Sequence, residues 1–304
     1  MRILASYILR GPMQAVAVSA SFGLLTLLLP PLSYLSGGAV GLVTLRHGPR
    51  QGAVVVIGAM LAMALLGVLV LGSVILPLVL AVALWLPLWA LAAVLWRSGS
   101  LVLTVQLAAL LGLAWVIGMH LWLGPPAVFW IELLERIRPA LEQMQSGSST
   151  AELEQRLQAL AGVMTGALGA AMVVSLLLNL FLARWWQSLL FHPGGLRSEL
   201  HGLRLGYTIG TLVILLIALT GLGGGSVAAT ARDGLWALGA VYLLCGLAVL
   251  HSLAAHLRLH TAWLVVLYGV LFIDPVHLAP FLALLGFADS WVNFRCYFNR
   301  RAES

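Results

Sequence analysis

Asp274 is a carboxylate in the middle of a long apolar segment, and His277 follows it by three residues. Burying a carboxylate among apolar groups is costly, so an acid in such a segment is a candidate ligand or ion site by default. At this spacing Asp274 and His277 could bind an ion or relay a proton. The alternative is structural: Asp followed by Pro is a favoured helix start, and Asp274 would then cap the helix beginning at Pro275.

The remaining histidines predict no metal site. His256 and His260 are four residues apart, the spacing at which two histidines on one helix face can share a metal ion. No third ligand falls in register, although His251 lies nearby. We therefore interpret these three residues, and His120 beside Trp122, as interfacial histidines, and we expect neither a metal nor another cofactor.

Catalytic motifs are missing from the sequence. There is no nucleotide-binding loop, metalloprotease helix, serine elbow or cysteine cluster. The repeated glycines of 221–225 follow no predicted strand and lack the lysine and hydroxyl of a phosphate loop, so we interpret them as a flexible loop. Cys245 and Cys296 lie in different segments without metal-ligand spacing. We expect no catalytic residue and no enzymatic activity.

Composition indicates a membrane protein. The chain is 62% hydrophobic and only 9% charged, whereas a soluble domain has about a quarter of its residues charged. Since ~20 apolar residues span a bilayer, the length accommodates roughly eight spans. The expected fold class is all-α: a polytopic integral membrane helix bundle forming a single transmembrane domain over residues 1–304. The net charge of +6 indicates orientation in a lipid bilayer rather than nucleic-acid binding.

Long apolar runs locate the spans, which we expect at residues 14–29, 53–71, 74–95, 101–123, a run ending near 182, 205–222 and 235–253. The first and last hairpins are expected to be broken or re-entrant. Pro30 and Pro31 stop the first span and leave a short stretch, and Asp274–Pro275 split the apolar residues 261–286 in two. Membranes tolerate such irregular backbone only inside the protein or beside a water-filled cavity.

Residues 124–160 form an amphipathic insert. Apolar residues recur there at helical spacing between charged ones: Trp130, Leu133, Leu134, Ile137, Leu141 and Met144. A serine- and glycine-rich break at 146–150 divides the segment. We expect an extramembrane helical hairpin on or near the membrane surface, with its second arm continuous with a transmembrane helix.

The arginines give the orientation. Alternating the spans across the bilayer places both termini and twelve of the sixteen basic residues on one face, including Arg46, Arg50, Arg97, Arg184, Arg197, Arg204 and Arg258. The positive-inside rule assigns this face to the cytoplasm. The amphipathic insert and a loop containing Arg232–Asp233 then fall on the non-cytoplasmic side.

Ala15, Ser19 and Gly23 form a stripe of small residues at four-residue spacing along the first span. Small side chains let helix backbones approach closely in lipid. The stripe therefore packs either within this protein or against a separate membrane protein partner.

Three stretches resemble one bacterial family. They are the proline-broken first hairpin ending in Leu42-Val-Thr-Leu45-Arg46-His-Gly48, the amphipathic insert, and the ending Leu285-Gly286-Phe-Ala-Asp289-Ser-Trp291-Val-Asn293-Phe294-Arg295. They resemble the YybS-like family (domain of unknown function 2232), over nearly the whole chain. That family comprises predicted multispanning inner-membrane proteins without an assigned activity, distantly similar to the substrate-binding S components of energy-coupling-factor vitamin transporters.

The resemblance implies a helical module of the bacterial inner membrane that binds a small molecule within its bundle. It also implies docking to a coupling subunit through the first helix, where Ala15, Ser19 and Gly23 are the matching positions. Asp289 and Arg295 are the polar pair of the terminal motif. Their alternative role is interfacial, with Asp289 ending the last apolar segment and Arg295 reaching lipid phosphate.

Two function classes stay open. The first, which we favour, is a transport-related module that binds a small solute or lipid in a cavity lined by the breaks at Pro30–Pro31 and Asp274–Pro275, as broken helices do in transporters. The second is a non-catalytic scaffold of the cell envelope or division machinery, whose external hairpin and basic loops recruit partners. A membrane enzyme is disfavoured, because only Asp274, His277 and Asp289 offer a start.

Overall fold

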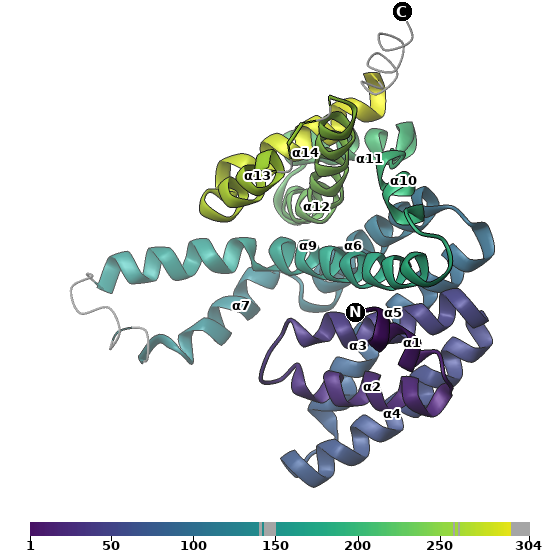
Figure 1. Ribbon diagram of the computed structural model, residues 1–304. Coiled ribbons are helices and arrows are strands. Elements are labelled where there is room, and N and C mark those ends of the chain that lie inside the picture. The colour runs from purple at the N-terminus through teal and green to yellow at the C-terminus, as the bar shows by residue number, and fades with distance from the viewer. Residues whose placement is uncertain (140–141, 143–149, 258, 261, 293–304) are drawn as a thin grey trace, which may run out of the picture. The chain divides into compact units, whose positions relative to one another are not determined.

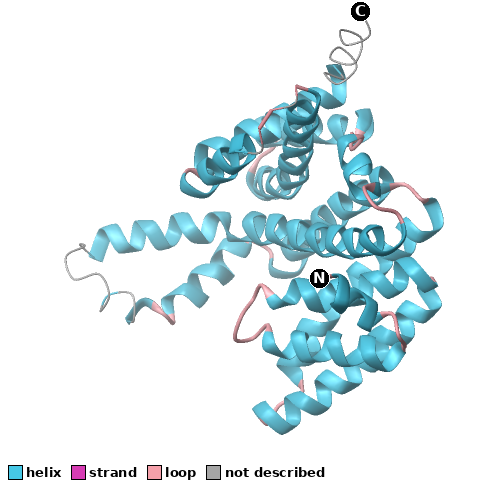
Figure 2. Ribbon diagram, in the orientation of Figure 1, coloured by secondary structure: helices cyan, strands magenta, loops and turns pink. Residues whose placement is uncertain are grey.

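The computed structural model describes residues 1–139, 142, 150–257, 259–260 and 262–292. In these ranges the regular structure is helical, and Figure 2 shows helices joined by short loops, without a strand. The predicted all-α fold class is confirmed. The chain divides into two compact units, of which unit 1 is Met1–Ala108 with Val174–Leu203 and unit 2 is Ala109–Val173 with Arg204–Ser304.

Unit 1 contains the first five helices of the chain and a later short one. The first five are α1 (Arg2–Ile8), α2 (Pro12–Leu25), α3 (Leu32–His47), α4 (Pro49–Leu71) and α5 (Ile75–Ser98), and the later one is α10 (Gly195–His201). The helices α2 to α5, purple to blue in Figure 1, pack on one another. Gly72 and Gly99 end α4 and α5 with φ of 68° and 62°, a left-handed conformation that favours glycine after a helix.

A buried hydrogen-bond chain ties three helices of unit 1 together. The indole N–H of Trp85 on α5 donates to Ser36 Oγ on α3 over 3.1 Å. The Ser36 hydroxyl in turn donates to the backbone carbonyl of Ser19 on α2 over 2.7 Å. Because all three residues are buried, these bonds satisfy polar groups that would otherwise be costly inside the unit.

Unit 2 contains α7 (Pro126–Glu135), α11 (Gly206–Leu222), α12 (Gly225–His256), α13 (Ala262–Ile273) and α14 (Pro275–Val292). Two further helices, α6 (Leu101–Leu123) and α9 (Thr150–Phe191), contribute residues to both units. Within unit 2, α12 packs against α11 and α14, and α13 contacts α14, as the green and yellow ribbons of Figure 1 show.

The crossing of α12 and α14 depends on two glycines. A Cβ added at Gly246 would overlap the carbonyl oxygen of Leu282, and one added at Gly286 would overlap the carbonyl oxygen of Tyr242. Each helix thus presents a residue without a side chain to the backbone of the other, which is how small residues bring membrane helices together.

Among the described residues, six helices are long and apolar enough to cross a membrane: α4, α5, α6, α9, α12 and α14. Counting α10 and α11 together as one bent span gives seven. The protein is a polytopic helical membrane protein, with fewer spans than the roughly eight expected at ~20 residues each. The difference arises at the two ends, because α2, α3 and α13 have only 14, 16 and 12 residues.

The helix breaks predicted at the two ends are present. Pro30 and Pro31 lie between α2, which ends at Leu25, and α3, which begins at Leu32. Asp274 separates α13 from α14. The helix α6 coincides with the predicted span at 101–123, and the spans predicted at 53–71 and 235–253 lie within α4 and α12.

The predicted Arg232–Asp233 loop is wrong. The helix α12 begins at Gly225 and runs without interruption to His256, so both residues lie inside it. The physical reason is that residues 226–233 contain neither proline nor glycine, so nothing interrupts helical hydrogen bonding after Gly225.

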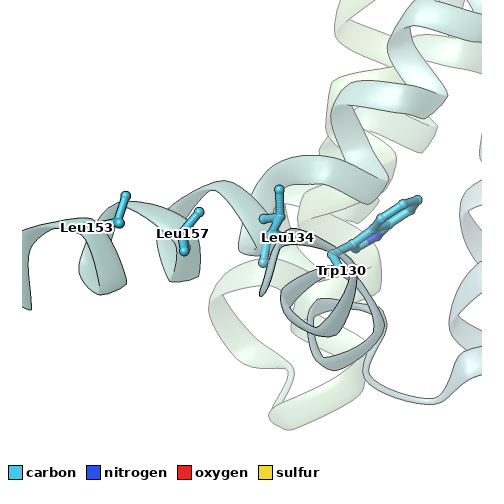
Figure 3. Packing of buried hydrophobic residues seen from close by; sticks show 5 residues of the cluster. Trp130, Leu134, Leu153 and Leu157 are labelled. Carbon is cyan, nitrogen blue, oxygen red and sulfur yellow. The ribbon is translucent and has the colours of Figure 1, made fainter. Parts of the chain in front are cut away.

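The predicted hairpin is formed by α7 and the beginning of α9. Trp130 and Leu134 of α7 are buried against residues of α9, as Figure 3 shows, and that partner set is Leu153, Leu157 and Ala161. Leu133 and Ile137, predicted on the same apolar face, are exposed instead, while Leu141 and Met144 lie outside the described residues. Since α9 is continuous from Thr150 to Phe191, the second arm does continue into a transmembrane helix.

Candidate functional site

His120 and Asp233 form a buried pair inside unit 2. Nε2 of His120 on α6 lies 2.9 Å from Oδ2 of Asp233 on α12, and each side chain is only 6% exposed. Both helices are candidate membrane spans. Ionisable side chains within spans are rare and mark ion or substrate pathways, so this pair is the strongest candidate site in the described chain.

The pair lies near one end of its two helices. His120 is three residues before the last residue of α6, which is about 5 Å along a helix axis. Asp233 is eight residues after the first residue of α12, which is about 12 Å. The end of α6 near His120 leads through Gly124 and Pro125 directly into α7. The pair therefore lies near one end of each candidate span, and this end of α6 adjoins α7.

Close helix packing encloses the carboxylate. A Cβ added at Gly166 on α9 would lie 3.1 Å from the Asp233 Cα and 2.6 Å from the Trp236 ring. A Cβ added at Gly234 would lie 2.8 Å from Leu113 on α6 and 3.2 Å from Leu216 on α11. Three helices thus approach α12 around Asp233, and the exclusion of water strengthens its interaction with His120.

Each partner keeps one polar atom without a hydrogen bond. In the part of the chain that the structure describes, Nδ1 of His120 and Oδ1 of Asp233 are buried and have no hydrogen-bond partner. An unsatisfied buried polar group costs about 1–3 kcal/mol. The pair therefore offers a ring nitrogen and a carboxylate oxygen to a ligand, at a cost in stability.

The hairpin contacts the residues next to this pair. Trp130 of α7 donates its indole N–H to Thr165 Oγ1 on α9 over 2.7 Å, and Thr165 precedes Gly166. Met119, which precedes His120, also packs against the hydrophobic cluster of the hairpin. The cluster of α7 thus extends from the hairpin to the neighbours of both His120 and Asp233.

Asp274 and His277, the pair singled out in the sequence, also interact with each other. His277 Nδ1 lies 2.9 Å from Asp274 Oδ1, and the His277 backbone N–H donates to the same oxygen over 3.3 Å. Asp274 therefore caps the first turn of α14, the structural alternative. The side chains are 84% exposed for His277 and 48% exposed for Asp274, in contrast to the buried His120–Asp233 pair. An ion or ligand role for Asp274 stays a prediction.

Asp289 is buried, and the arginine that reaches it comes from elsewhere in the chain. Arg204 donates from Nε to the Asp289 carbonyl oxygen and from Nη2 to the Ser290 carbonyl oxygen, both over 2.9 Å. It thereby donates to two carbonyl groups in the last turn of α14. Arg295, the partner considered from the sequence, lies outside the described residues.

The small-residue stripe is enclosed within unit 1, since Ala15, Ser19 and Gly23 are all buried. A Cβ added at Gly23 would lie 2.9 Å from Met63 Sδ and 3.0 Å from Trp85. The stripe therefore packs within this protein, which is the first of the two alternatives given from the sequence. Docking of a separate protein through α2 stays a prediction.

The predicted breaks do not form a site by themselves. Pro30 and Pro31 belong to unit 1 and Pro275 to unit 2, and all three are exposed. A cavity lined by both breaks therefore stays a prediction.

No metal centre is formed by the described residues, among which no three His, Cys, Asp or Glu side chains gather. His251 instead donates from Nδ1 to the Leu247 carbonyl oxygen over 2.8 Å, and its Nε2 lies 3.4 Å from the Tyr268 hydroxyl. His260 accepts a hydrogen bond from the Ala262 N–H through Nδ1. The two histidines considered as a metal pair, His256 and His260, are both exposed.

The class of protein follows from the fold and the spans: this is a multi-pass helical membrane protein. Protein-family models, curated proteins and solved structures were each compared with the chain, and none matches it. The resemblance to the YybS-like family is therefore carried by the residues quoted above alone.

Proposed function

We propose that this protein is a transport-related membrane protein that binds a small polar solute, with the His120–Asp233 pair as its polar centre. One observation carries the proposal: an acid and a histidine are buried within two spans, each with an unpartnered polar atom. Apolar residues of similar size at these positions are often as stable or more stable. The pair therefore costs stability, and a function that needs it explains its presence.

The position of the pair supports solute entry from the side of the membrane at which α7 begins. A polar centre within about 12 Å of a helix end lies nearer to the water at that end of the span than to the water at the other. A carboxylate oxygen and a ring nitrogen select a solute with polar or charged groups over the acyl chain of a lipid. We propose no catalytic step.

We further propose that the protein lies in a bacterial cytoplasmic membrane, with both termini in the cytoplasm and the α7 hairpin outside. The support is the gathering of arginines in alternate loops and the rule that cytoplasmic loops are rich in basic residues. Kinship with the YybS-like family belongs to the same proposal.

A scaffold role is the second candidate, and one observation favours it. Phe129 and Leu133 are exposed four residues apart on α7, and exposed Ile137 follows just after the helix ends. The other side of α7 is buried against α9. Such a stripe could bind lipid or another envelope protein. Proximity labelling from α7 that recovers a consistent set of envelope proteins, in cells whose metabolites do not change on loss of the gene, would replace transport by this role.

The transport proposal is tested by metabolite profiling of cells that lack the gene. Loss of the gene should alter the ratio of intracellular to extracellular amounts for at least one small polar metabolite. The wild-type gene and the Asp274→Asn variant should restore the ratio, because the exposed pair is a cap. The Asp233→Asn variant, produced at equal level in the membrane, should not. Unchanged ratios on loss of the gene, or restoration by Asp233→Asn, would contradict the proposal.

A further inference from the structure

We propose that the His120–Asp233 pair takes up and releases one proton, at Nδ1 of His120, and that this proton is the coupling ion of the proposed transport. The inference rests on the proposed function for the coupling, and on the geometry of the pair for the proton. An ion and the atom that binds it are thereby assigned to the site.

The carboxylate determines which ring nitrogen is the base. Nε2 of His120 faces Asp233 Oδ2 at 2.9 Å, and an ionised carboxylate only accepts, so Nε2 carries the hydrogen. In the neutral ring Nδ1 then holds the lone pair. In the described part of the chain nothing donates a hydrogen bond to Nδ1. It is therefore free to accept a proton, with formation of a single N–H bond.

Charge balance favours a proton as the ion. With His120 neutral and Asp233 ionised, the pair has a net charge of −1, which is unfavourable in a membrane interior. A proton at Nδ1 converts it into a neutral ion pair. The proton comes from water and returns to water, and no other bond is made or broken.

The surrounding helices supply no other charge to balance Asp233. In unit 2 the enclosing segments, 109–123 of α6, 157–173 of α9 and 206–222 of α11, contain no Asp, Glu, Arg or Lys. Besides His120, these segments and the nearby part of α12 contain two tyrosines. Tyr207 lies at the start of α11, away from Asp233, and Tyr242 lies on α12. Arg232, adjacent in sequence, is exposed, and on α7 Glu132 and Glu135 are also exposed. His120 is therefore the group in contact with Asp233 that can carry the compensating charge.

Coupling follows from the second unpartnered atom. A solute that contacts Asp233 Oδ1 meets a carboxylate whose charge is either uncompensated or paired with an imidazolium. Its affinity therefore differs between the two protonation states, and by linkage the solute changes proton affinity by the same factor. The proton and the solute are thus coupled through one side chain.

The experiment is a proton-uptake measurement on purified full-length protein in detergent, without buffer, taken from about pH 8 to about pH 5, which brackets the ordinary range for histidine. Wild type should take up about one proton per molecule more than Asp233→Asn, and about one more than the double variant Asp233→Asn with His120→Gln. The double variant should lose the same single proton, because both substitutions remove one shared site. Elution volume and melting temperature are checked for each variant, and Asp233→Glu should retain the uptake.

The chain provides a matched control. Asp274 and His277 are also 2.9 Å apart, but they are largely exposed, so Asp274→Asn should leave proton uptake unchanged because water still solvates the charged His277 ring. Equal proton uptake by wild type and Asp233→Asn would overturn the proton site, even if loss of the gene changes the metabolite ratios. Additive loss of two protons in the double variant would overturn a shared site. A normal uptake difference without any metabolite effect would overturn the coupling.

Discussion

Trp130 of α7 donates its indole N–H to the hydroxyl oxygen of Thr165 on α9 over 2.7 Å. Thr165 directly precedes Gly166, the glycine of α9 that lies against Asp233. Trp130 and Thr165 are both buried. This bond connects α7 of the hairpin to α9, one of the helices that enclose the buried pair. The conformation of the hairpin and the geometry of the pair are therefore linked through residues 165 and 166.

Loss of this bond should loosen the hairpin. Thr165→Val keeps the side-chain shape but leaves the buried indole N–H without an acceptor, at a cost of about 1–3 kcal/mol. We expect a lower melting temperature and faster proteolysis within α7. Thr220→Val is the control, because the Thr220 hydroxyl donates to the Leu216 carbonyl of its own helix. Equal effects of the two substitutions would contradict an anchoring role for Thr165.

The crossing of α12 and α14 should be intolerant of a single methyl group. Gly246→Ala places a Cβ against the Leu282 carbonyl oxygen, so the helices must separate, and we expect a loss of about 1–3 kcal/mol, the cost typical of overpacking. Gly239→Ala on the same helix meets nothing within 4 Å and should be neutral or slightly stabilising. Melting curves of the two variants in one detergent make the comparison. A neutral Gly246→Ala would show that the crossing is looser than described.

Arg204 should hold the end of α14. Arg204→Ala leaves the carbonyl oxygens of Asp289 and Ser290 without their charged donor, and hydrogen bonds to charged groups contribute about 1.5–3 kcal/mol. Amide hydrogen exchange should accelerate in residues 286–292 and remain slow in α4. Arg197→Ala, which changes an exposed arginine, should leave both regions as they are. Unchanged exchange at 286–292 would remove Arg204 from this role.

The orientation predicts labelling from opposite sides of the membrane. In a variant lacking Cys245 and Cys296, a cysteine at exposed Leu133 should react with an impermeant maleimide added to intact cells. A cysteine at exposed Arg97 should react only after the membrane is opened, because α6 lies between the two positions and crosses the bilayer. Labelling of Arg97→Cys in intact cells would invert the topology.

Much of the fold could be predicted from the sequence. A segment that crosses lipid must be a long apolar helix, so polar residues gather in the breaks between such segments. The boundaries of α6, the breaks at Pro30–Pro31 and Asp274, and the continuity of α9 are all visible there. The short helices α2, α3 and α13 reduce the span count, since a run of apolar residues does not reveal where helical hydrogen bonding stops.

The candidate site was missed because its two residues are 113 positions apart. His120 beside Trp122, and Asp233 beside Arg232, each resemble an interfacial residue when considered alone. One signal was present: residues 226–233 lack glycine and proline, so the helix of the following span could have been extended back through Asp233. An acid inside a span would then have been evident, but its histidine partner depends on the packing of α6 against α12.

The central claim is that His120 and Asp233 are present for function and not for stability, and replacing both by apolar residues tests it most directly. His120→Leu combined with Asp233→Val should melt at the wild-type temperature or above it, because apolar substitutes for a buried ion pair are often neutral or stabilising by about 1–4 kcal/mol. The same protein should fail to restore the metabolite ratios of cells lacking the gene. Full restoration by this stable double variant would contradict the claim.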